Sequence, residues 1–195
     1  KDKDCPAKFF FFFSNIDYIM DKLMNWMDKN GLTENTIFIY MTDNGTCSGE
    51  NVFNAGMKGK KTSLWEGGHR VPFFIRWPGG NLEGPCDIDI LTEGQDLLPT
   101  LIDLCNLNIS DQVTFDGISL SGFLREQENT QNQEKIKDRM LVVQYGNNPG
   151  KWNATIMWKK WRLVTGDKHY NINENHHQDN NFYQKYPDIV TSIKK

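Results

Sequence analysis

The sequence contains few cysteines, and they follow no recognisable pattern. Only four of its 195 residues are cysteines, at positions 5, 47, 86 and 105. They are too few and too scattered for a disulfide framework, and they lack the C-x-x-C spacing of metal and redox sites. Their number allows one or two bridges, so the cysteines leave the redox compartment undetermined.

Long hydrophobic runs are also absent. The five phenylalanines at residues 9–13 form a run shorter than the roughly 7–15 residues of a signal-peptide core, and the flanks are acidic. No stretch reaches the roughly 20 apolar residues that span a bilayer. We therefore expect a soluble chain that contains neither a secretion signal nor a membrane span.

Neither sign of charge predominates. The sequence has 22 Lys and Arg against 25 Asp and Glu, which gives a formal net charge of −3. It has no basic block typical of nucleic-acid binding and no acidic tail. With 38% hydrophobic residues, the composition is that of a soluble globular protein, long enough for one large domain or one domain with a small appendage.

The first periodic segment predicts an amphipathic helix over about residues 12–30. Ser14, followed by Asp17, offers a capping start, and Gly31 lies just beyond the C-terminal end. Apolar residues recur at spacings of three and four, and we expect them to face a core. These residues are Ile16, Met20, Leu23 and Met27.

Two apolar runs predict the strands of an α/β layer. Residues 37–41 are nearly all apolar and rich in β-branched and aromatic side chains, which is typical of a strand buried on both faces. Residues 71–77 have a proline near their start, which favours an edge strand or the beginning of a strand. A helical pattern follows over 97–107, with Pro99 in its first turn.

The rest of the chain predicts a smaller antiparallel unit. Short β-like runs at hairpin spacing follow a polar segment that we interpret as a surface connection. The order of elements therefore predicts an α/β layer with a separate antiparallel subdomain. The expected segments are a short helical stretch to about 124, the connection 126–138, strands at 140–145, 154–158 and 161–165, a loop at 171–181 and a helix at 186–193.

A polar turn follows the first strand and is a candidate metal site. Asp43 and Asn44 present one charged and one neutral oxygen at the C-terminal end of a buried strand, where open α/β sheets bind ligands. Hard oxygens of this kind suit Ca²⁺ or Mg²⁺. Taken alone, Asp-Asn-Gly is also ordinary turn chemistry.

The following segment makes a family resemblance specific. Thr42-Asp43-Asn44-Gly45, a short insertion and then Lys-x-x-x-Trp-Glu-Gly-Gly-x-Arg-Val-Pro at residues 61–72 resemble the sulfatase family. Gly56 departs from the family pattern, because proline is common there. The likeness continues through 96–101, 115–120 and 161–172, and it would start the first helix earlier, in the phenylalanine run.

The resemblance implies a fold and a division of the chain. The fold is α/β, a partial alkaline-phosphatase-like sandwich in which helices flank a mixed sheet, followed by a small antiparallel β subdomain with a C-terminal helix. Residues 1–125 would be the C-terminal part of the catalytic domain. Residues 126–138 would be the polar connection, and residues 139–195 the small subdomain.

The resemblance also assigns roles within the site. Asp43 and Asn44 would be ligands of Ca²⁺ (or Mg²⁺). Lys61, which lies five residues before the Glu-Gly-Gly segment, would contact the sulfate, and its neighbours Lys58 and Lys60 would not. The chemistry agrees, because a sulfate beside a divalent cation needs a further cation to stabilise the charge that develops on the transferred group.

Four neighbouring residues are expected to support this loop, and a fifth has two interpretations. Gly67 and Gly68 permit a tight turn, and a partly buried pair of Glu66 with Arg70 would anchor the loop. His69 is most simply a loop histidine, with contact to the substrate as the alternative.

The nucleophile that the resemblance calls for is absent. The family makes formylglycine from a Cys or Ser in a C/S-x-P-x-R motif, and Cys5 does not fit, because Ala7 and Phe9 stand where proline and arginine belong. The aspartate pair, lysine and histidine of the family's first half are absent too. We therefore expect an inactive C-terminal half whose partner is the missing N-terminal half, with apolar sheet edge and helix face left exposed.

The implied parent enzyme is a sulfuric ester hydrolase acting on a sulfated small molecule or glycan. Its expected location is secreted, periplasmic or lysosomal, by resemblance only. One alternative is a phospho- or phosphonate-ester hydrolase of the same superfamily. Another is a truncated module that retains a binding or structural role without catalysis.

Overall fold

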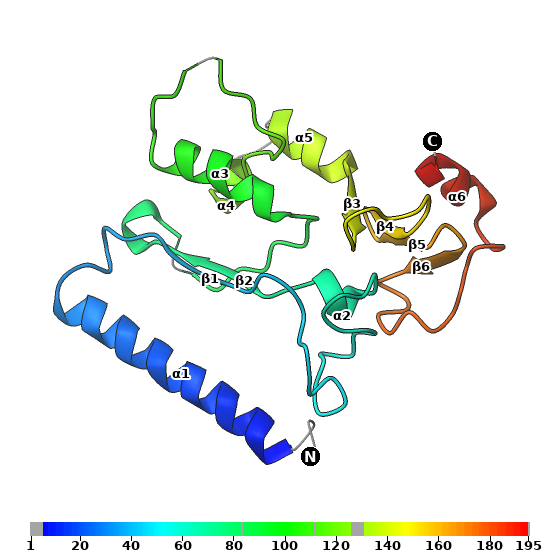
Figure 1. Ribbon diagram of the computed structural model, residues 1–195. Helices are drawn as coiled ribbons and strands as arrows, with labels where there is room; N and C mark the ends of the chain where they lie inside the picture. Colours follow the sequence, from blue (N-terminus) through cyan, green and yellow to red (C-terminus); the bar gives the residue numbers. More distant parts are fainter. Residues whose placement is uncertain (1–5, 83, 111, 126–130, 195) are drawn as a thin grey trace.

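The computed structural model describes residues 6–82, 84–110, 112–125 and 131–194 (Figure 1). An α/β part comes first, and a short helix, an antiparallel sheet and a C-terminal helix follow. The α/β part contains α1 (Pro6–Lys29), β1 (Phe38–Met41), α2 (Glu66–His69), β2 (Phe73–Arg76), α3 (Leu97–Leu104) and α4 (Ser121–Leu124). The later elements are α5 (Gln131–Asp138), β3 (Met140–Gln144), β4 (Ala154–Trp158), β5 (Trp161–Val164), β6 (Lys168–Asn171) and α6 (Pro187–Lys194).

Helix α1 begins at Pro6, about six residues before the start predicted from apolar spacing. Ser14 lies inside the helix and does not cap it, so the capping prediction was wrong. Proline is favoured in a first helical turn, where its missing N–H has no partner to lose. Five successive phenylalanines cover every side of a helix that turns about 100° per residue, which hides the period near this end.

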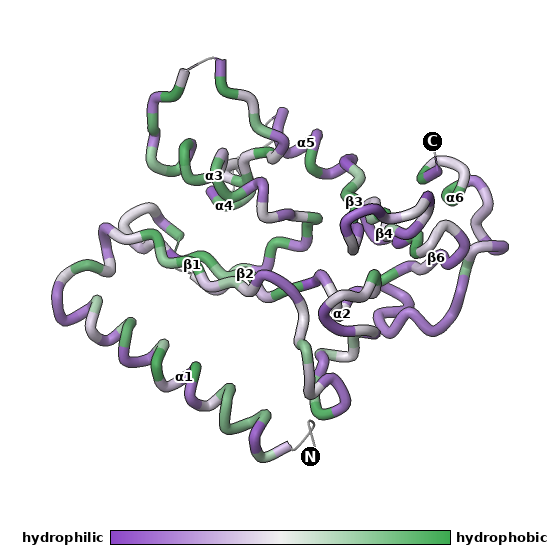
Figure 2. The backbone as a smooth tube through the Cα atoms, in the orientation of Figure 1, coloured by the Kyte–Doolittle hydropathy of each residue, from purple (hydrophilic) through white to green (hydrophobic). Residues whose placement is uncertain are grey.

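Most of the apolar surface of α1 is uncovered. Figure 2 shows hydrophobic positions along the whole helix, and Phe11 is 75% exposed. Of the four residues that we expected to face a core, Met27 is buried, Ile16 and Met20 are half-buried, and Leu23 is 42% exposed. No helix among the described residues is both long enough and apolar enough to cross a membrane.

Strands β1 and β2 form a two-stranded antiparallel sheet in which Phe38 pairs with Arg76 and Met41 with Phe73. Figure 1 shows α1 on one side of this sheet and α3 with α4 on the other, which confirms the expected α/β arrangement. Burial on both faces of the first strand was not found, because β1 is only half-buried and its last residue is exposed.

The C-terminal part is a meander in the order β3-β4-β5-β6, with every neighbouring pair antiparallel. Helix α6 packs on it through Val190 and Ile193, which cluster with Leu163 of β5. The three predicted strands lie within a residue of their expected bounds. Strand β6 was not predicted, since three of its four residues are polar or charged, although His169 and Asn171 are fully buried.

Part of the expected polar connection is a helix. Residues 131–138 form α5, whose Ile136 is buried and whose Gln133 donates its side-chain amide to the carbonyl oxygen of Gly122 at 3.0 Å. Residues 126–130 lie outside the described residues. The division of the chain at 125 and 139 stays a prediction.

A buried ion pair joins the start of α3 to the chain just before β3. Arg139 donates both terminal nitrogens to the two carboxylate oxygens of Asp96, at 2.8 and 2.6 Å. The backbone N–H of Ile118 also donates to Asp96, at 2.8 Å. One carboxylate thus ties together two of the sequence segments that carry the family resemblance and the entry to the C-terminal sheet.

Leu163 is only 1% exposed at the centre of the β5–α6 contact, so Leu163→Ala should leave a cavity. We expect the free energy of unfolding to fall by about 2–5 kcal/mol, measured by urea denaturation. Val142→Ala on the exposed side of β3 is the control and should stay within about 0.5 kcal/mol of the unsubstituted protein. Equal losses in the two variants would contradict this account of the core.

Candidate functional site

The candidate metal residues lie in the turn that follows β1. Asp43 is exposed and Asn44 is half-buried. The hydroxyl of Thr42 donates to the carbonyl oxygen of Asn44 at 3.3 Å, which closes the turn on itself. The turn therefore leaves the Asp43 carboxylate accessible.

This turn packs directly on the segment that contains the Glu-Gly-Gly sequence. The backbone N–H of Gly45 donates to the carbonyl oxygen of Gly68 at 3.0 Å, and that of Lys61 donates to the carbonyl oxygen of Thr46 at 2.8 Å. A Cβ on Gly67 would lie 2.6 Å from the Asn54 amide nitrogen, well inside van der Waals contact. Glycine at position 67 therefore allows α2 to lie against residues 54–59, the part of the loop that precedes Lys61.

The three lysines of this loop differ in their partners. Lys60 pairs with Glu50 at 2.5 Å. The Lys58 ammonium lies 4.3 Å from the centre of the Trp65 ring and 3.4 Å from the carbonyl oxygen of Gln178. Lys61 is exposed, and its ammonium has no hydrogen-bond or ion-pair partner within the described ranges. It is the ammonium left accessible for a ligand.

Glu66, at the start of α2, is the buried anchor of this loop. It is 1% exposed, and its Oε1 accepts from Nε of Arg162 at 2.8 Å. The expected partner Arg70 is farther away, at 3.5 Å, and its side chain is half exposed. Sequence analysis missed Arg162 as a partner. The residue stands in a segment that carries the family resemblance, but nothing in the spacing joins it to a carboxylate 96 residues earlier.

Further contacts from the C-terminal part hold the same loop. Oε1 of the fully buried Gln178 accepts from the backbone N–H of Glu66 at 3.0 Å. The hydroxyl of Thr155 donates to the carbonyl oxygen of Leu64, and a ring nitrogen of His176 lies 2.9 Å from the carbonyl oxygen of Ala55. These residues sit in β4 and in the loop after β6, so the site loop rests on the C-terminal sheet.

His69 lies at the end of α2, next to this ion pair. Burial lowers its pKa below 6.5, and the Glu66 carboxylate opposes that shift only in part. Its Nε2 is 3.9 Å from the nearest Glu66 oxygen and has no hydrogen-bond partner in the described structure. The imidazole is therefore mainly neutral near pH 7.

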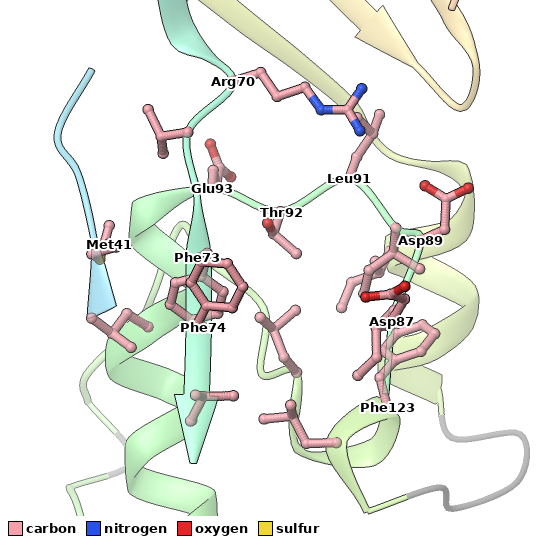
Figure 3. A pocket seen from close by; sticks show the side chains of 18 of the residues that line it. Met41, Arg70, Phe73, Phe74, Asp87, Asp89, Leu91, Thr92, Glu93 and Phe123 are labelled. Atoms are coloured by element: carbon pink, nitrogen blue, oxygen red, sulfur yellow. The ribbon is translucent and has the colours of Figure 1, made fainter. Parts of the chain in front are cut away.

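A broad cleft opens beside these residues, and its lining includes Asp43 and His69. Figure 3 shows Phe73 and Phe74 of β2 on one side and Asp87 and Asp89 on the other, with Arg70 extending above. Burial, and next the nearby Asp96 charge, raise the pKa of Glu93. The cleft wall combines apolar surface with carboxylates, and Lys61 lies outside its lining.

The metal-binding capacity of the described part is small. Asp43 and Asn44 supply oxygens of the right kind for Ca²⁺ or Mg²⁺, but two ligands are fewer than such ions use. Elsewhere in the described residues no group of three or more His, Cys, Asp or Glu could hold a metal. Three cysteines, Cys47, Cys86 and Cys105, are unpaired and exposed, and Cys5 lies outside the described residues.

Comparisons with known proteins point to one family. The Sulfatase family profile matches residues 8–107. An arylsulfatase of Clostridium perfringens is 32% identical over 131 residues, which cover 66% of this chain and 26% of that protein. Human steryl-sulfatase is 27% identical over 158 residues, which cover 74% of this chain and 26% of that protein. The chain thus spans about a quarter of the length of these relatives.

Solved structures give the same fold. A structure from work on glycosaminoglycan metabolism by Bacteroides thetaiotaomicron matches 92% of this chain and 41% of its own, with a TM-score of 0.70 and 21% identity. Another, solved with its substrate D-glucosamine-2-N,6-O-disulfate, matches 92% of this chain and 36% of its own, with a TM-score of 0.65 and 19% identity.

The close approach of residues 54–59 to Gly67 of α2 can be tested directly. Gly67→Ala would place a Cβ 2.8 Å from the carbonyl oxygen of Lys58, so we expect a lower melting temperature and faster amide exchange at Gly45 and Lys61. Gly94→Ala is the matched control, because the new Cβ meets nothing within 4 Å. If both variants melt and exchange alike, the packing of these segments does not require glycine.

The lowered pKa of His69 predicts a pH dependence of stability. Because the folded-state pKa lies below the unfolded value of about 6.5, the unfolded chain binds more protons in the window between the two values. Stability contributed by neutral His69 is therefore present above about pH 6.5 and is lost as the pH falls through that window. His69→Gln should reduce the difference in unfolding free energy between pH 7.5 and pH 5. The exposed His177→Gln serves as control, and equal slopes in both variants would argue against the assignment.

Proposed function

Because this chain belongs to the sulfatase family, we propose that it is part of the catalytic domain of a sulfuric ester hydrolase. The observation that carries the proposal is that the loop of Lys61, whose ammonium has no partner among the described residues, lies against the Asp43–Asn44 turn, which presents oxygen ligands. The Lys61 backbone N–H donates to Thr46 at 2.8 Å, and the Gly45 N–H donates to Gly68 at 3.0 Å. These two bonds hold the Lys61 loop against the Asp43–Asn44 turn.

The residues of this chain would divide the work of binding a sulfate ester. Asp43 and Asn44 would hold Ca²⁺ (or Mg²⁺), and the Lys61 ammonium would contact the sulfate from its own side. When bound, the cation would supply Lewis-acid stabilisation of the sulfate oxygens, and a formylglycine from the N-terminal half would supply the nucleophile. Lys61 would stabilise the negative charge that develops on the transferred group. Glu66, Gly67, Gly68 and Arg70 would support the loop.

The remaining groups of the site would come from outside these 195 residues. No C/S-x-P-x-R segment occurs in the sequence, and the chain spans about a quarter of its curated relatives. The exposed apolar side chains of α1, with Phe74 of β2 at 65% exposure, are the surface that we infer the N-terminal half of the catalytic domain covers. We therefore propose that the isolated chain does not turn over sulfate esters.

The substrate class follows from the same reasoning. We infer a sulfated small molecule or glycan, supported by the disulfated glucosamine bound in one structure of this fold. Contact of His69 with the substrate stays the alternative to a loop histidine, and its place in the cleft lining supports that alternative. A secreted, periplasmic or lysosomal location stays a prediction.

Substitution of Lys61 tests this function in the full-length protein of which we propose this chain is a part. Lys61→Ala should lower kcat/KM for an aryl sulfate by roughly 10²-fold or more, because it removes a cation placed where charge develops. Lys60→Ala, which removes an ammonium that is paired with Glu50, should retain activity.

Matched phosphate and phosphonate esters separate the alternatives. Faster hydrolysis of the phosphorus esters would favour a phospho- or phosphonate-ester hydrolase, and the absence of turnover on every ester would favour a non-catalytic module. Equal activity of the Lys61→Ala and Lys60→Ala variants would remove Lys61 from the site.

A further inference from the structure

The loop that carries Lys61 takes its side-chain anchors from the C-terminal sheet. Its contacts with the Asp43–Asn44 turn are backbone bonds. Arg162, Thr155 and Gln178 make polar side-chain contacts with it, in addition to contacts within the loop such as the bond from the Asn54 amide to the carbonyl oxygen of Gly59 at 2.8 Å. In addition, the Trp65 ring packs edge-on against Tyr170 of β6, with ring centres 5.6 Å apart. The position of Lys61 therefore depends on a part of the chain that contributes no reacting group.

Arg162 is the most tightly fixed of these anchors. Its side chain is 6% exposed, and its Nε donates to Glu66 at 2.8 Å. Its Nη1 donates to the carbonyl oxygens of Lys159 and Trp161, at 2.9 and 3.0 Å, in the turn between β4 and β5. A planar guanidinium held on one side by backbone carbonyls can present its Nε in only one direction. The β4–β5 turn thus sets where the Glu66 carboxylate lies.

Glu66 is linked through its neighbours Gly67 and Gly68 to both the Lys61 loop and the Asp43–Asn44 turn. It begins α2, in which Gly67 donates its backbone N–H to the carbonyl oxygen of Lys58 at 2.8 Å. The next residue, Gly68, accepts the Gly45 N–H at 3.0 Å, directly after the Asp43–Asn44 turn. One carboxylate therefore sits between the lysine loop and the proposed metal ligands.

We propose that Arg162 is a positioning residue, which acts through Glu66 to fix the Lys61 loop relative to the Asp43–Asn44 turn. The catalytic consequence rests on the proposed function, whereas the positional consequence does not. Loss of the Arg162–Glu66 bond should loosen the backbone bonds at Gly45, Lys61 and Gly67. It should also lower kcat more than it raises KM, since a displaced Lys61 loses contact with the charge that develops during transfer.

The chain offers a matched control for this test. Arg139 also donates to a buried carboxylate, that of Asp96. The Arg139 side chain is 10% exposed and that of Asp96 is 1% exposed, which is close to the 6% of Arg162 and the 1% of Glu66. It does not contact the Lys61 loop. Arg162→Lys and Arg139→Lys therefore both replace a buried guanidinium by an ammonium, but only the first alters the support of the site. Glu66→Gln, which keeps size and an acceptor oxygen, serves if Arg162→Lys does not fold.

Amide exchange by NMR and ester kinetics in the full-length protein give two independent readouts. Arg162→Lys should speed exchange at Gly45, Lys61 and Gly67 by about 10-fold or more, because it removes a hydrogen bond between charged groups. It should also lower kcat for an aryl sulfate by about 10-fold. Arg139→Lys should lower the melting temperature with neither change.

The outcomes separate this inference from the proposed function. If Arg162→Lys leaves exchange at these three amides equal to that in Arg139→Lys, the positioning role is wrong. If the unsubstituted protein hydrolyses no sulfate ester, the proposed function fails, and the exchange measurements still decide the role of Arg162. A fall in kcat of the same size in both arginine variants would also overturn the inference.

Discussion

The carboxylate of Glu66 and the guanidinium of Arg162 meet in the interior, 96 residues apart in the sequence, with almost no contact with solvent. Burial of two charges costs several kcal/mol unless their geometry and their remaining hydrogen bonds are satisfied. Here the backbone N–H of Glu66 donates to the side chain of Gln178, and the guanidinium of Arg162 donates to the carbonyl oxygens of Lys159 and Trp161. This contact joins the site loop, which packs on the turn after β1, to the centre of the C-terminal sheet.

Local features of the sequence were sufficient for most elements and for the residue types at the site. Strands β4 and β5 and helices α3 and α6 were predicted to within a few residues, because apolar period and turn residues are local signals. The placement of Asp43, Asn44 and Lys61 near one another came from the family resemblance alone. The apolar spacing missed the start of α1, because five phenylalanines in succession carry no period, whereas the family resemblance moved that start into the phenylalanine run. Strand β6 was missed, because two of its three buried residues, His169 and Asn171, are polar.

Long-range partners could not be predicted. A buried polar residue looks the same in sequence as an exposed one, so nothing marked Arg162, Gln178 or Thr155 as supports of the loop. Arg70 was predicted to pair with Glu66 because it is near in sequence, yet the more distant arginine is closer in space. The exposed apolar surface of α1 is a different case, because here burial was predicted and was mostly not observed. Its apolar spacing predicts burial, yet among the described residues of α1 only Met27 is buried.

A second buried pair shows what these ion pairs contribute. Asp96 and Arg139 are 43 residues apart and join the α3 region to the entry of the C-terminal sheet, as Glu66 and Arg162 join α2 to its centre. Apolar residues of the same volume commonly give equal or greater stability than a buried ion pair. Stability alone therefore does not account for either pair. Fixed geometry does, since a bidentate or carbonyl-locked arginine allows one relative position of the segments it joins, whereas an apolar contact tolerates sliding. In this protein two arginines join the α/β part to the C-terminal sheet, and the proposed sulfate-binding loop lies at one of those two points.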